Sequence, residues 1–269
     1  DSTDAIMPSN MQIATFNCNS IRARVGIVMD WLQRVRPDVL ALQETKCQDR
    51  DFPAAAFADA GYHVHFRGEK SYNGVAIVSR HEPDEVRFGL GDGDDAASET
   101  RLALARFGAW HVLNTYVPQG RQLGSEPFAF KLEWLARLGR LFDARFDLQR
   151  NRVVWVGDLN VAPTPADVYD PKSLWPHVCF CQEAIDALAA VTGRGMVDVF
   201  RKHLPGEGVY TYWDYRMRRG VQRNRGWRID HVLASPPAAQ RSVEVVVDME
   251  PRRAEKPSDH TFVLARFRA

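Results

Sequence analysis

Several polar side chains stand at or near the ends of apolar runs of the sequence. Because a side chain at the end of a strand emerges at the rim of its sheet, a rigid scaffold holds it in place. Each of these residues alone also fits a structural role, such as a turn or an ion pair. Together their types suggest one chemistry, and the set consists of Asn17, Glu44, Asp158, Asn160, Asp230, Asp259 and His260.

The set offers carboxylates, amides and an Asp–His pair, and it contains no cysteine. Hard oxygen ligands suit Mg²⁺ or Mn²⁺ better than Zn²⁺. A metal ion of this kind acts on phosphate oxygens, while an aspartate takes a proton from the attacking water and an amide holds that aspartate. A histidine fixed by a carboxylate binds or protonates phosphate. The residues therefore predict metal-assisted hydrolysis of a phosphate ester.

Positive charge is concentrated in one segment, although the net charge of the chain is only +1. Residues 201–228 contain eight Lys or Arg against two acidic residues, and tyrosines and tryptophans lie between them. Arginine forks hold phosphates and flat rings stack on bases, so this composition is typical of a nucleic-acid surface. A solvated loop in an arginine-rich protein is the alternative reading, because the chain has 29 Arg and only 6 Lys.

Short β-rich runs recur along the whole sequence and must position these side chains. Nine of them are predicted as strands: residues 12–16, 39–42, 75–79, 102–107, 111–117, 153–156, 229–234, 243–247 and 261–267. Helical patterns lie between them at residues 22–35, 52–60, 128–146, 182–191 and 196–203, the first after a cap at Ser20. This order is typical of an α/β sandwich, in which two mixed sheets pack face to face and helices lie outside.

Composition excludes several other classes of protein. With 45% hydrophobic and 26% charged residues, the chain is an ordinary globular protein. No apolar run approaches the roughly 18 residues of a membrane helix, and the polar residues 1–10 do not resemble a signal peptide. Four scattered cysteines favour reduced thiols in a cytoplasmic protein. No linker or repeat divides the chain, so a single domain is predicted over residues 11–269, with residues 1–10 outside it.

Seven motifs, in order, resemble those of the exonuclease III family of DNA-repair nucleases. They cover nearly the whole chain and lie at residues 16–24 (Phe-Asn-Cys-Asn-Ser-Ile-Arg-Ala-Arg), 42–46 (Leu-Gln-Glu-Thr-Lys), 72–77 (Tyr-Asn-Gly-Val-Ala-Ile), 114–120 (Asn-Thr-Tyr-Val-Pro-Gln-Gly), 157–162 (Gly-Asp-Leu-Asn-Val-Ala), 226–231 (Gly-Trp-Arg-Ile-Asp-His) and 258–260 (Ser-Asp-His). The resemblance implies a four-layer α/β sandwich. It also implies Mg²⁺-dependent hydrolysis of DNA phosphodiesters in base excision repair, with Mn²⁺ as a substitute metal.

The activities that this resemblance implies are incision 5′ of abasic sites, 3′–5′ exonuclease activity and 3′-phosphodiesterase activity. The implied partner is double-stranded DNA with abasic sites or 3′ ends, bound by a monomeric enzyme. By resemblance, the metal would be held by Asn17, Glu44 and Asp259, with a second position at Asp158 and Asn160.

The resemblance also assigns catalytic roles. Asp158 would align or deprotonate the attacking water, and Asn160 would orient that water. His260, supported by Asp230, would contact the scissile phosphate together with Tyr116. The DNA-binding residues would be Gln119, Arg121, Tyr212, Trp227, Arg228 and Ile229, and three of them, Tyr212, Trp227 and Ile229, would line the pocket for a flipped, baseless sugar.

The sequence departs from the family pattern in two places. Asn19 stands where some members have aspartate, and residues 163–181 do not match closely. The nearest alternative is a phosphoinositide or other phosphoesterase of the wider superfamily, but residues 226–230 have the form found in the DNA-repair branch. A secreted DNase I-like nuclease and a DNA-binding module without activity are two further alternatives. The presence of Glu44, Asp158 and His260 argues against the last.

Overall fold

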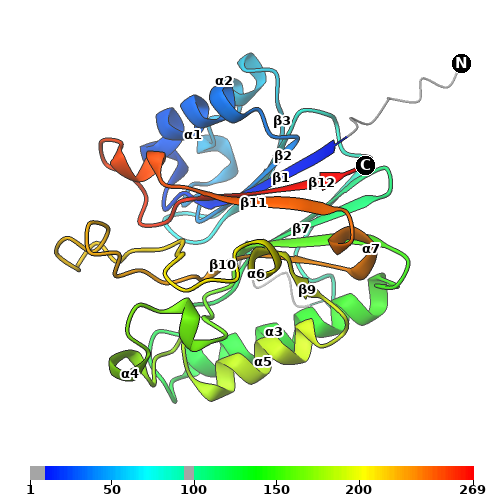
Figure 1. Ribbon diagram of the computed structural model, residues 1–269. Helices are drawn as coiled ribbons and strands as arrows, with labels where there is room; N and C mark the ends of the chain where they lie inside the picture. Colours follow the sequence, from blue (N-terminus) through cyan, green and yellow to red (C-terminus); the bar gives the residue numbers. More distant parts are fainter. Residues whose placement is uncertain (1–9, 94–99) are drawn as a thin grey trace, which may run out of the picture.

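The computed structural model describes residues 10–93 and 100–269, so most of the predicted N-terminal segment lies outside the described residues. Two six-stranded sheets pack face to face, and helices cover their outer faces (Figure 1). This is the predicted α/β sandwich. Among the described residues, no helix is long and apolar enough to cross a membrane. The cytoplasmic location stays a prediction.

The first sheet contains the two ends of the described chain. Its strands lie in the order β11-β12-β1-β2-β4-β3. Their bounds are β1 (Asn10–Asn17), β2 (Val39–Gln43), β3 (His63–Arg67), β4 (Val75–Ser79), β11 (Ser242–Asp248) and β12 (Phe262–Arg268). At the centre, β1 and β2 are parallel, whereas β12 is antiparallel to β1.

The second sheet repeats this plan in the middle of the chain. Its order is β5-β6-β7-β8-β10-β9. The bounds are β5 (Glu85–Phe88), β6 (Leu102–Phe107), β7 (Trp110–Tyr116), β8 (Arg152–Asp158), β9 (Val197–Asp198) and β10 (Asp230–Ala234). Here β7 and β8 are the parallel central pair, and β10 is antiparallel to β8.

Helices form the outer layers because one face of each is apolar. In Figure 1, α1 (Ile21–Val35) and α2 (Ala54–Asp59) cover the first sheet, and α3 (Glu126–Arg145) and α5 (Gln182–Thr192) cover the second. The shorter helical segments are α4 (Pro171–Leu174), α6 (Val199–His203), α7 (Pro236–Ala239), η1 (Asp49–Asp51), η3 (Pro165–Asp167) and η4 (Glu250–Arg253).

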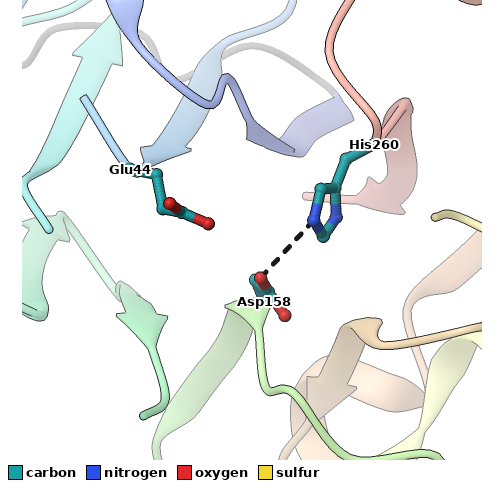
Figure 2. A group of neighbouring side chains, drawn as sticks. All are labelled: Glu44, Asp158 and His260. Carbon is teal, nitrogen blue, oxygen red and sulfur yellow. Dashed lines mark ion pairs between the residues drawn. The ribbon is translucent and has the colours of Figure 1, made fainter. Parts of the chain in front are cut away.

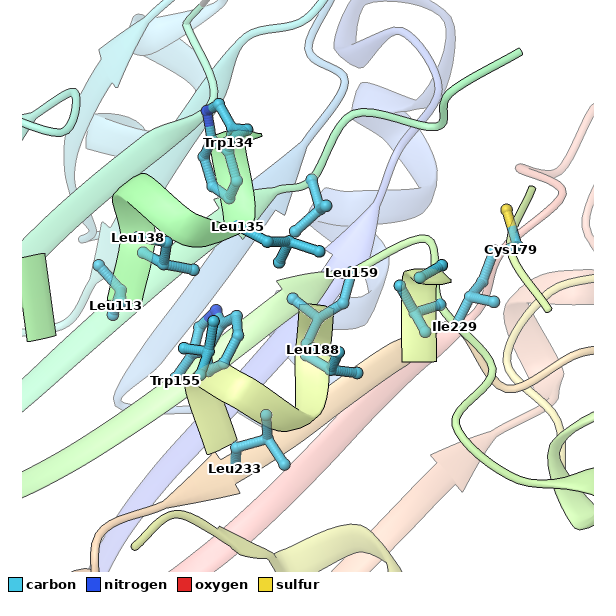
Figure 3. Packing of buried hydrophobic residues seen from close by; sticks show 14 of the residues in the cluster. Leu113, Trp134, Leu135, Leu138, Trp155, Leu159, Cys179, Leu188, Ile229 and Leu233 are labelled. Atoms are coloured by element: carbon cyan, nitrogen blue, oxygen red, sulfur yellow. The ribbon is translucent and has the colours of Figure 1, made fainter. Parts of the chain in front are cut away.

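Three layers of buried side chains hold the sandwich together. The central layer, with Val39, Val156 and Val232, lies between the sheets. A second layer lies under α1 and α2. A third lies under α3 and α5, where Trp155 of β8 packs among leucines of both helices (Figure 3). A rigid core therefore backs each strand that ends at the site described below.

The structure confirms all nine predicted strands and four of the five predicted helices, and each end lies within two residues of its prediction. The pattern at 196–203 is wrong in part, because residues 197–198 pair as β9 and only 199–203 are helical. Ser20 precedes α1 but makes no capping hydrogen bond with its side chain. The edge strands β3 and β5 were missed, because both are half-exposed and carry charged or histidine side chains between few apolar ones.

Candidate active site

The carboxyl ends of two parallel strand pairs meet at one rim of the sandwich. Asn17 ends β1, Glu44 follows β2, and Asp158 ends β8. Parallel neighbours end at the same edge of a sheet, and the face-to-face packing brings both edges together. Gly157 allows a close approach here, because a Cβ at its φ of +140° would lie 2.0 Å from the carbonyl oxygen of Thr115 on β7.

Glu44, Asp158 and His260 form the centre of this rim (Figure 2). One ligand atom from each lies within 4.8 Å of the others. Asn17 joins the two carboxylates, because its Nδ2 donates to Glu44 Oε1 at 2.7 Å and to Asp158 Oδ2 at 2.9 Å. The first sheet thus supplies Asn17 and Glu44, and the second supplies Asp158.

His260 lies between two aspartates. Its Nδ1 lies 2.7 Å from Asp230 Oδ2, and its Nε2 lies 3.7 Å from Asp158 Oδ2. Burial alone would lower the pKa of His260, but the charges of Asp230 and Asp158 outweigh burial and raise it. Both carboxylates therefore favour the charged form of the imidazole, in which Nδ1 donates to Asp230.

For Asp158, burial is the dominant influence on the pKa. Burial raises the pKa of its carboxyl, the His260 imidazolium opposes this, and the negative charges of Asp230 and Glu44 reinforce it. The net effect is a raised pKa. A buried carboxylate beside like charges is a stronger base than a solvated one, as a proton acceptor requires.

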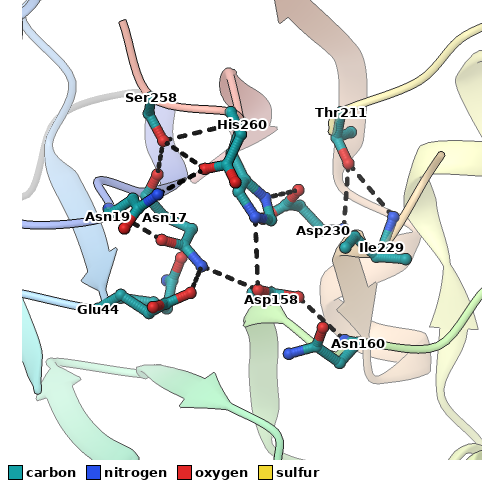
Figure 4. Close-up of polar contacts among 12 residues, drawn as sticks. Asn17, Asn19, Glu44, Asp158, Asn160, Thr211, Ile229, Asp230, Ser258 and His260 are labelled. Atoms are coloured by element: carbon teal, nitrogen blue, oxygen red, sulfur yellow. Dashed lines mark hydrogen bonds and ion pairs between the residues drawn. The ribbon is translucent and has the colours of Figure 1, made fainter. Parts of the chain in front are cut away.

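Two hydrogen bonds, from Ser258 and from Asn19, join the loop before β12 to the end of β1 (Figure 4). Ser258 Oγ donates to the carbonyl oxygen of Asn17, which ties the loop before β12 to the end of β1. Asn19 Nδ2 donates to Asp259 Oδ1 at 3.0 Å. The asparagine that departs from the family pattern therefore positions a predicted metal ligand in this chain.

Lys46 is a site residue that the sequence reasoning missed. Its Nζ lies 2.7 Å from Glu44 Oε2 and donates to Asn19 Oδ1 at 2.6 Å. Burial would raise the pKa of the Glu44 carboxyl, but Lys46, Asn17 and the charge of His260 together outweigh burial and lower it. Its place two residues after Glu44, within the motif at residues 42–46, was the available signal.

Asn160 reaches Asp158 through its backbone. Its N–H donates to Asp158 Oδ1 at 3.0 Å, while its side-chain Nδ2 donates to the carbonyl oxygen of Val117 at 2.9 Å. Its roles as a water-orienting residue and as a second-position ligand stay predictions. Tyr116 lies at the end of β7, and burial together with the charges of Glu44 and Asp158 raises the pKa of its hydroxyl.

A cavity of about 280 Å³ opens beside these groups. It is lined by the predicted site residues Glu44, Tyr116, Gln119, Asp158, Asn160, Tyr212, Trp227, Ile229, Asp259 and His260. The segment that departed from the family pattern supplies Tyr169, Leu174, His177 and Cys179. The His177 and Trp227 rings lie 4.9 Å apart between centroids with their planes tilted by 54°, so the imidazole stands against the indole in the cavity wall.

One predicted DNA-binding residue is wrong. Arg228 is 0% exposed, and its guanidinium pairs with Asp167 at 2.6 Å and with Asp198 at 2.8 Å. An arginine held inside the protein by two carboxylates does not reach a phosphate on the surface. Arg121 is exposed in the loop after β7, outside the cavity lining, and its DNA contact stays a prediction.

The donor set fits a divalent cation. Glu44, Asp158 and Asp259 offer carboxylate oxygens at the rim, and Asn17 adds an amide oxygen. Hard oxygen donors and the absence of thiolates from the group are typical of sites for such ions. Glu44 and Asp259 would hold the ion, which leaves Asp158, oriented by the Asn17 amide, the Asn160 N–H and His260, for the attacking water.

Comparison with known proteins agrees with this geometry. Residues 14–260 match the model of the endonuclease/exonuclease/phosphatase family. The chain is 33% identical to exodeoxyribonuclease III of Haemophilus influenzae, over 96% of this chain and all of that one. It superposes on an AP endonuclease from Archaeoglobus fulgidus with a TM-score of 0.92 at 48% identity, covering 96% of this chain and 99% of the other.

A third relative is a 3′ phosphatase from Neisseria bound to a product DNA hairpin. It has a TM-score of 0.91 and 38% identity, and the match covers 96% of this chain and all of that one. The rim of oxygen donors, the Asp–His pair and the order of the motifs thus occur in a chain of which 96% aligns with each of these proteins. The chain belongs to the endonuclease/exonuclease/phosphatase family and, within it, to the exodeoxyribonuclease III group of AP endonucleases.

Proposed function

We propose that the protein is a DNA-repair nuclease that hydrolyses DNA phosphodiesters with Mg²⁺ as its natural metal and Mn²⁺ as a substitute. The observation that carries this proposal is the cluster of Glu44, Asp158 and His260 at one wall of a cavity. A monomeric enzyme is part of this proposal. The metal ion would neutralise the negative charge that grows on the phosphate during the reaction.

The side chains divide the remaining work. Asp158 accepts a proton from the water whose oxygen attacks phosphorus, and its raised pKa suits this task near neutral pH. The His260 imidazolium faces the cavity and donates to a phosphate oxygen, while Asp230 holds it in orientation. A new P–O bond forms to the water oxygen, the bond to the leaving ester oxygen breaks, and that oxygen takes up a proton.

The surface beside the cavity supports DNA as the substrate. The loop between Tyr215 and Arg225 extends outward from the sandwich (Figure 1), and its exposed arginines are Arg216, Arg218, Arg219, Arg223 and Arg225. A strip of guanidinium groups follows a polyphosphate backbone better than it binds a single headgroup. This charge favours a nuclease over the phosphoinositide phosphoesterase considered above.

A gel assay on two end-labelled duplexes tests this function. One duplex carries an internal tetrahydrofuran abasic analogue and the other a recessed 3′ end. Incision or 3′ shortening is expected with Mg²⁺ and with Mn²⁺, and EDTA should abolish both. Turnover of a phosphoinositide with neither DNA product would overturn the proposal, and undiminished cleavage in EDTA would contradict the metal requirement.

His177 favours 3′-end processing as the stronger of the two activities. Its ring stands against Trp227, the residue predicted to line the pocket for a flipped sugar, and both rings line the cavity. The imidazole therefore takes up space that an abasic nucleotide would have to enter. A 3′ terminus approaches with fewer constraints, because no strand continues beyond it. Incision inside a duplex also requires the nucleotide to be extruded, at a cost of a few kcal/mol.

His177→Ala is therefore expected to raise incision at the abasic analogue relative to 3′ shortening by about tenfold, since extra room relieves roughly 1–2 kcal/mol of steric cost. The two rates are measured on the duplexes above under single-turnover conditions. His63→Ala, an exposed histidine of β3, is the matched control and should leave the ratio unchanged. An unchanged ratio in His177→Ala would show that the ring does not limit entry.

A further inference from the structure

Helix α3 buries a lysine among its apolar side chains. Lys131 is 0% exposed, and it shares the interior face of the helix with Phe128, Trp134 and Leu135. Taking an ammonium group out of water costs several kcal/mol unless partners replace the water. Burial also lowers the pKa of this group. A lysine in this position calls for an explanation beyond the packing of the helix.

The three N–H groups of Lys131 meet three backbone carbonyls. Its Nζ donates to the carbonyl oxygens of Gln119 at 3.3 Å, Asn160 at 2.7 Å and Val178 at 2.6 Å. Within residues 10–93 and 100–269, no carboxylate forms an ion pair with it. An ammonium has three donors and no acceptor, so these three carbonyls use its full capacity.

The three carbonyls come from three separate loops at the active site. Gln119 lies between β7 and α3, Asn160 follows β8, and Val178 precedes α5. Gln119 and Asn160 line the cavity themselves, and Val178 stands between the lining residues His177 and Cys179. One side chain thus ties together three stretches of the cavity wall that the sequence separates by 18 to 59 residues.

The loop after β8 connects Lys131 to the chemistry. Asn160 has a positive φ of 49°, the left-handed conformation that asparagine adopts more readily than most other L-residues. Its carbonyl is held by Lys131, its side chain by the carbonyl of Val117, and its N–H donates to Asp158 Oδ1. The carbonyl and the N–H of Asn160 lie on either side of one Cα, so a displacement of Asn160 also moves the N–H that orients the Asp158 carboxylate.

We propose that Lys131 is a positioning residue for phosphodiester hydrolysis, which fastens the Asp158–Asn160 turn and the two neighbouring loops in the reactive arrangement. The inference rests on the proposed nuclease function. Lys131 does not touch the cavity, so it acts through the carbonyls that it holds. The buried ammonium of Lys131 therefore serves to hold the loops of the site in place.

Lys131→Met and Lys131→Gln test this role as a pair. Both side chains are one atom shorter than lysine, but only glutamine keeps two N–H donors. We expect Lys131→Met to lower the single-turnover cleavage rate at saturating enzyme by about 10- to 100-fold, because displacement of a reacting group by about 1 Å costs this much. Lys131→Gln should recover part of that loss, and the Kd for DNA should change by less than about threefold in both.

Leu138→Ala on the same helix is the matched control, because it opens the buried core away from the cavity. It should lower the midpoint of urea unfolding while leaving the cleavage rate of the folded enzyme unchanged.

If Lys131→Met loses no more activity than Leu138→Ala, or if Lys131→Gln and Lys131→Met lose equal amounts of activity, Lys131 is only a structural residue. If Lys131→Met does not fold, the comparison of Lys131→Gln with Leu138→Ala decides. Failure of the wild-type enzyme to cleave DNA would instead refute the proposed function.

Discussion

Asp158→Asn is expected to lower the rate of DNA cleavage by about 10²- to 10⁴-fold, the usual contribution of a general base. The substitution keeps the shape of the side chain but removes the charge that accepts the proton. It also places an NH₂ group where Asp158 accepts from Asn17 on one side and from the Asn160 N–H on the other, so one of the two bonds is lost. Single-turnover cleavage of the preferred duplex measures the effect.

This loss should occur without loss of DNA binding or of the fold. Removing a negative charge from a cavity that receives phosphate should leave the Kd for DNA unchanged or lower. The raised pKa of Asp158 means that its ionised form opposes folding above its ordinary pKa, because the unfolded state gives up this proton more readily. At pH 8, without metal, the free energy of unfolding of Asp158→Asn should therefore equal or exceed that of the wild type.

Asp186→Asn is the control for this experiment. Asp186 is exposed on α5, where it accepts from Gln182 of the same helix. The same chemical change there should alter neither cleavage nor stability beyond about 0.5 kcal/mol, as is usual at the surface. Cleavage by Asp158→Asn at a rate near that of the wild type would assign the proton acceptor to another group.

The strand ends were predictable because their signal is local. A run of apolar residues followed by a polar side chain identifies both the strand and the rim, as at Val153 to Asp158. The family motifs then indicated which rims belong together. The half-exposed strands β3 and β5 carry no such signal, because their edge position allows charged side chains on both faces.

The residues that the sequence did not indicate act through contacts between distant segments. Lys131 reads as one of many polar residues on a helix, and only the approach of three loops shows that its face is buried. Arg228 shows the same limit in the other direction. Its basic and aromatic neighbours predicted a DNA contact, whereas Asp167 and Asp198, from other elements, hold it inside. Tertiary partners decide whether a charge faces solvent, and neighbours in sequence do not reveal them.

Asp230→Asn should lower cleavage by about 10³- to 10⁴-fold if the Asp–His pair works as the aspartate of a serine-protease triad does, where this exchange costs about 10⁴. Asp230 contributes through His260, because its Oδ2 lies 2.7 Å from the imidazole Nδ1 and it does not line the cavity. An amide in its place no longer favours the imidazolium. His260 then faces the phosphate uncharged or turned away.

The protonation of His260 in the metal-free protein gives a readout that a loss of packing would not. In the wild type, Asp230 and Asp158 raise the pKa of His260, so the ring keeps its proton above its ordinary titration range. Removal of the Asp230 charge takes away the larger of the two attractions while burial continues to disfavour the charged form. At pH 8 in EDTA, the ¹⁵N shifts of the ring should therefore indicate an imidazolium in the wild type and a neutral imidazole in Asp230→Asn.

Asp198→Asn distinguishes this effect from the general loss of an aspartate that pairs with a buried partner. Asp198 pairs with Arg228 behind the cavity and does not contact His260, so its removal should cost stability without changing the His260 signal. If His260 is neutral in the wild type at pH 8, or stays charged in Asp230→Asn, Asp230 does not set its protonation. The phosphate contact would then be a hydrogen bond from a neutral ring. Such a bond is weaker because the ring no longer carries a positive charge opposite the phosphate.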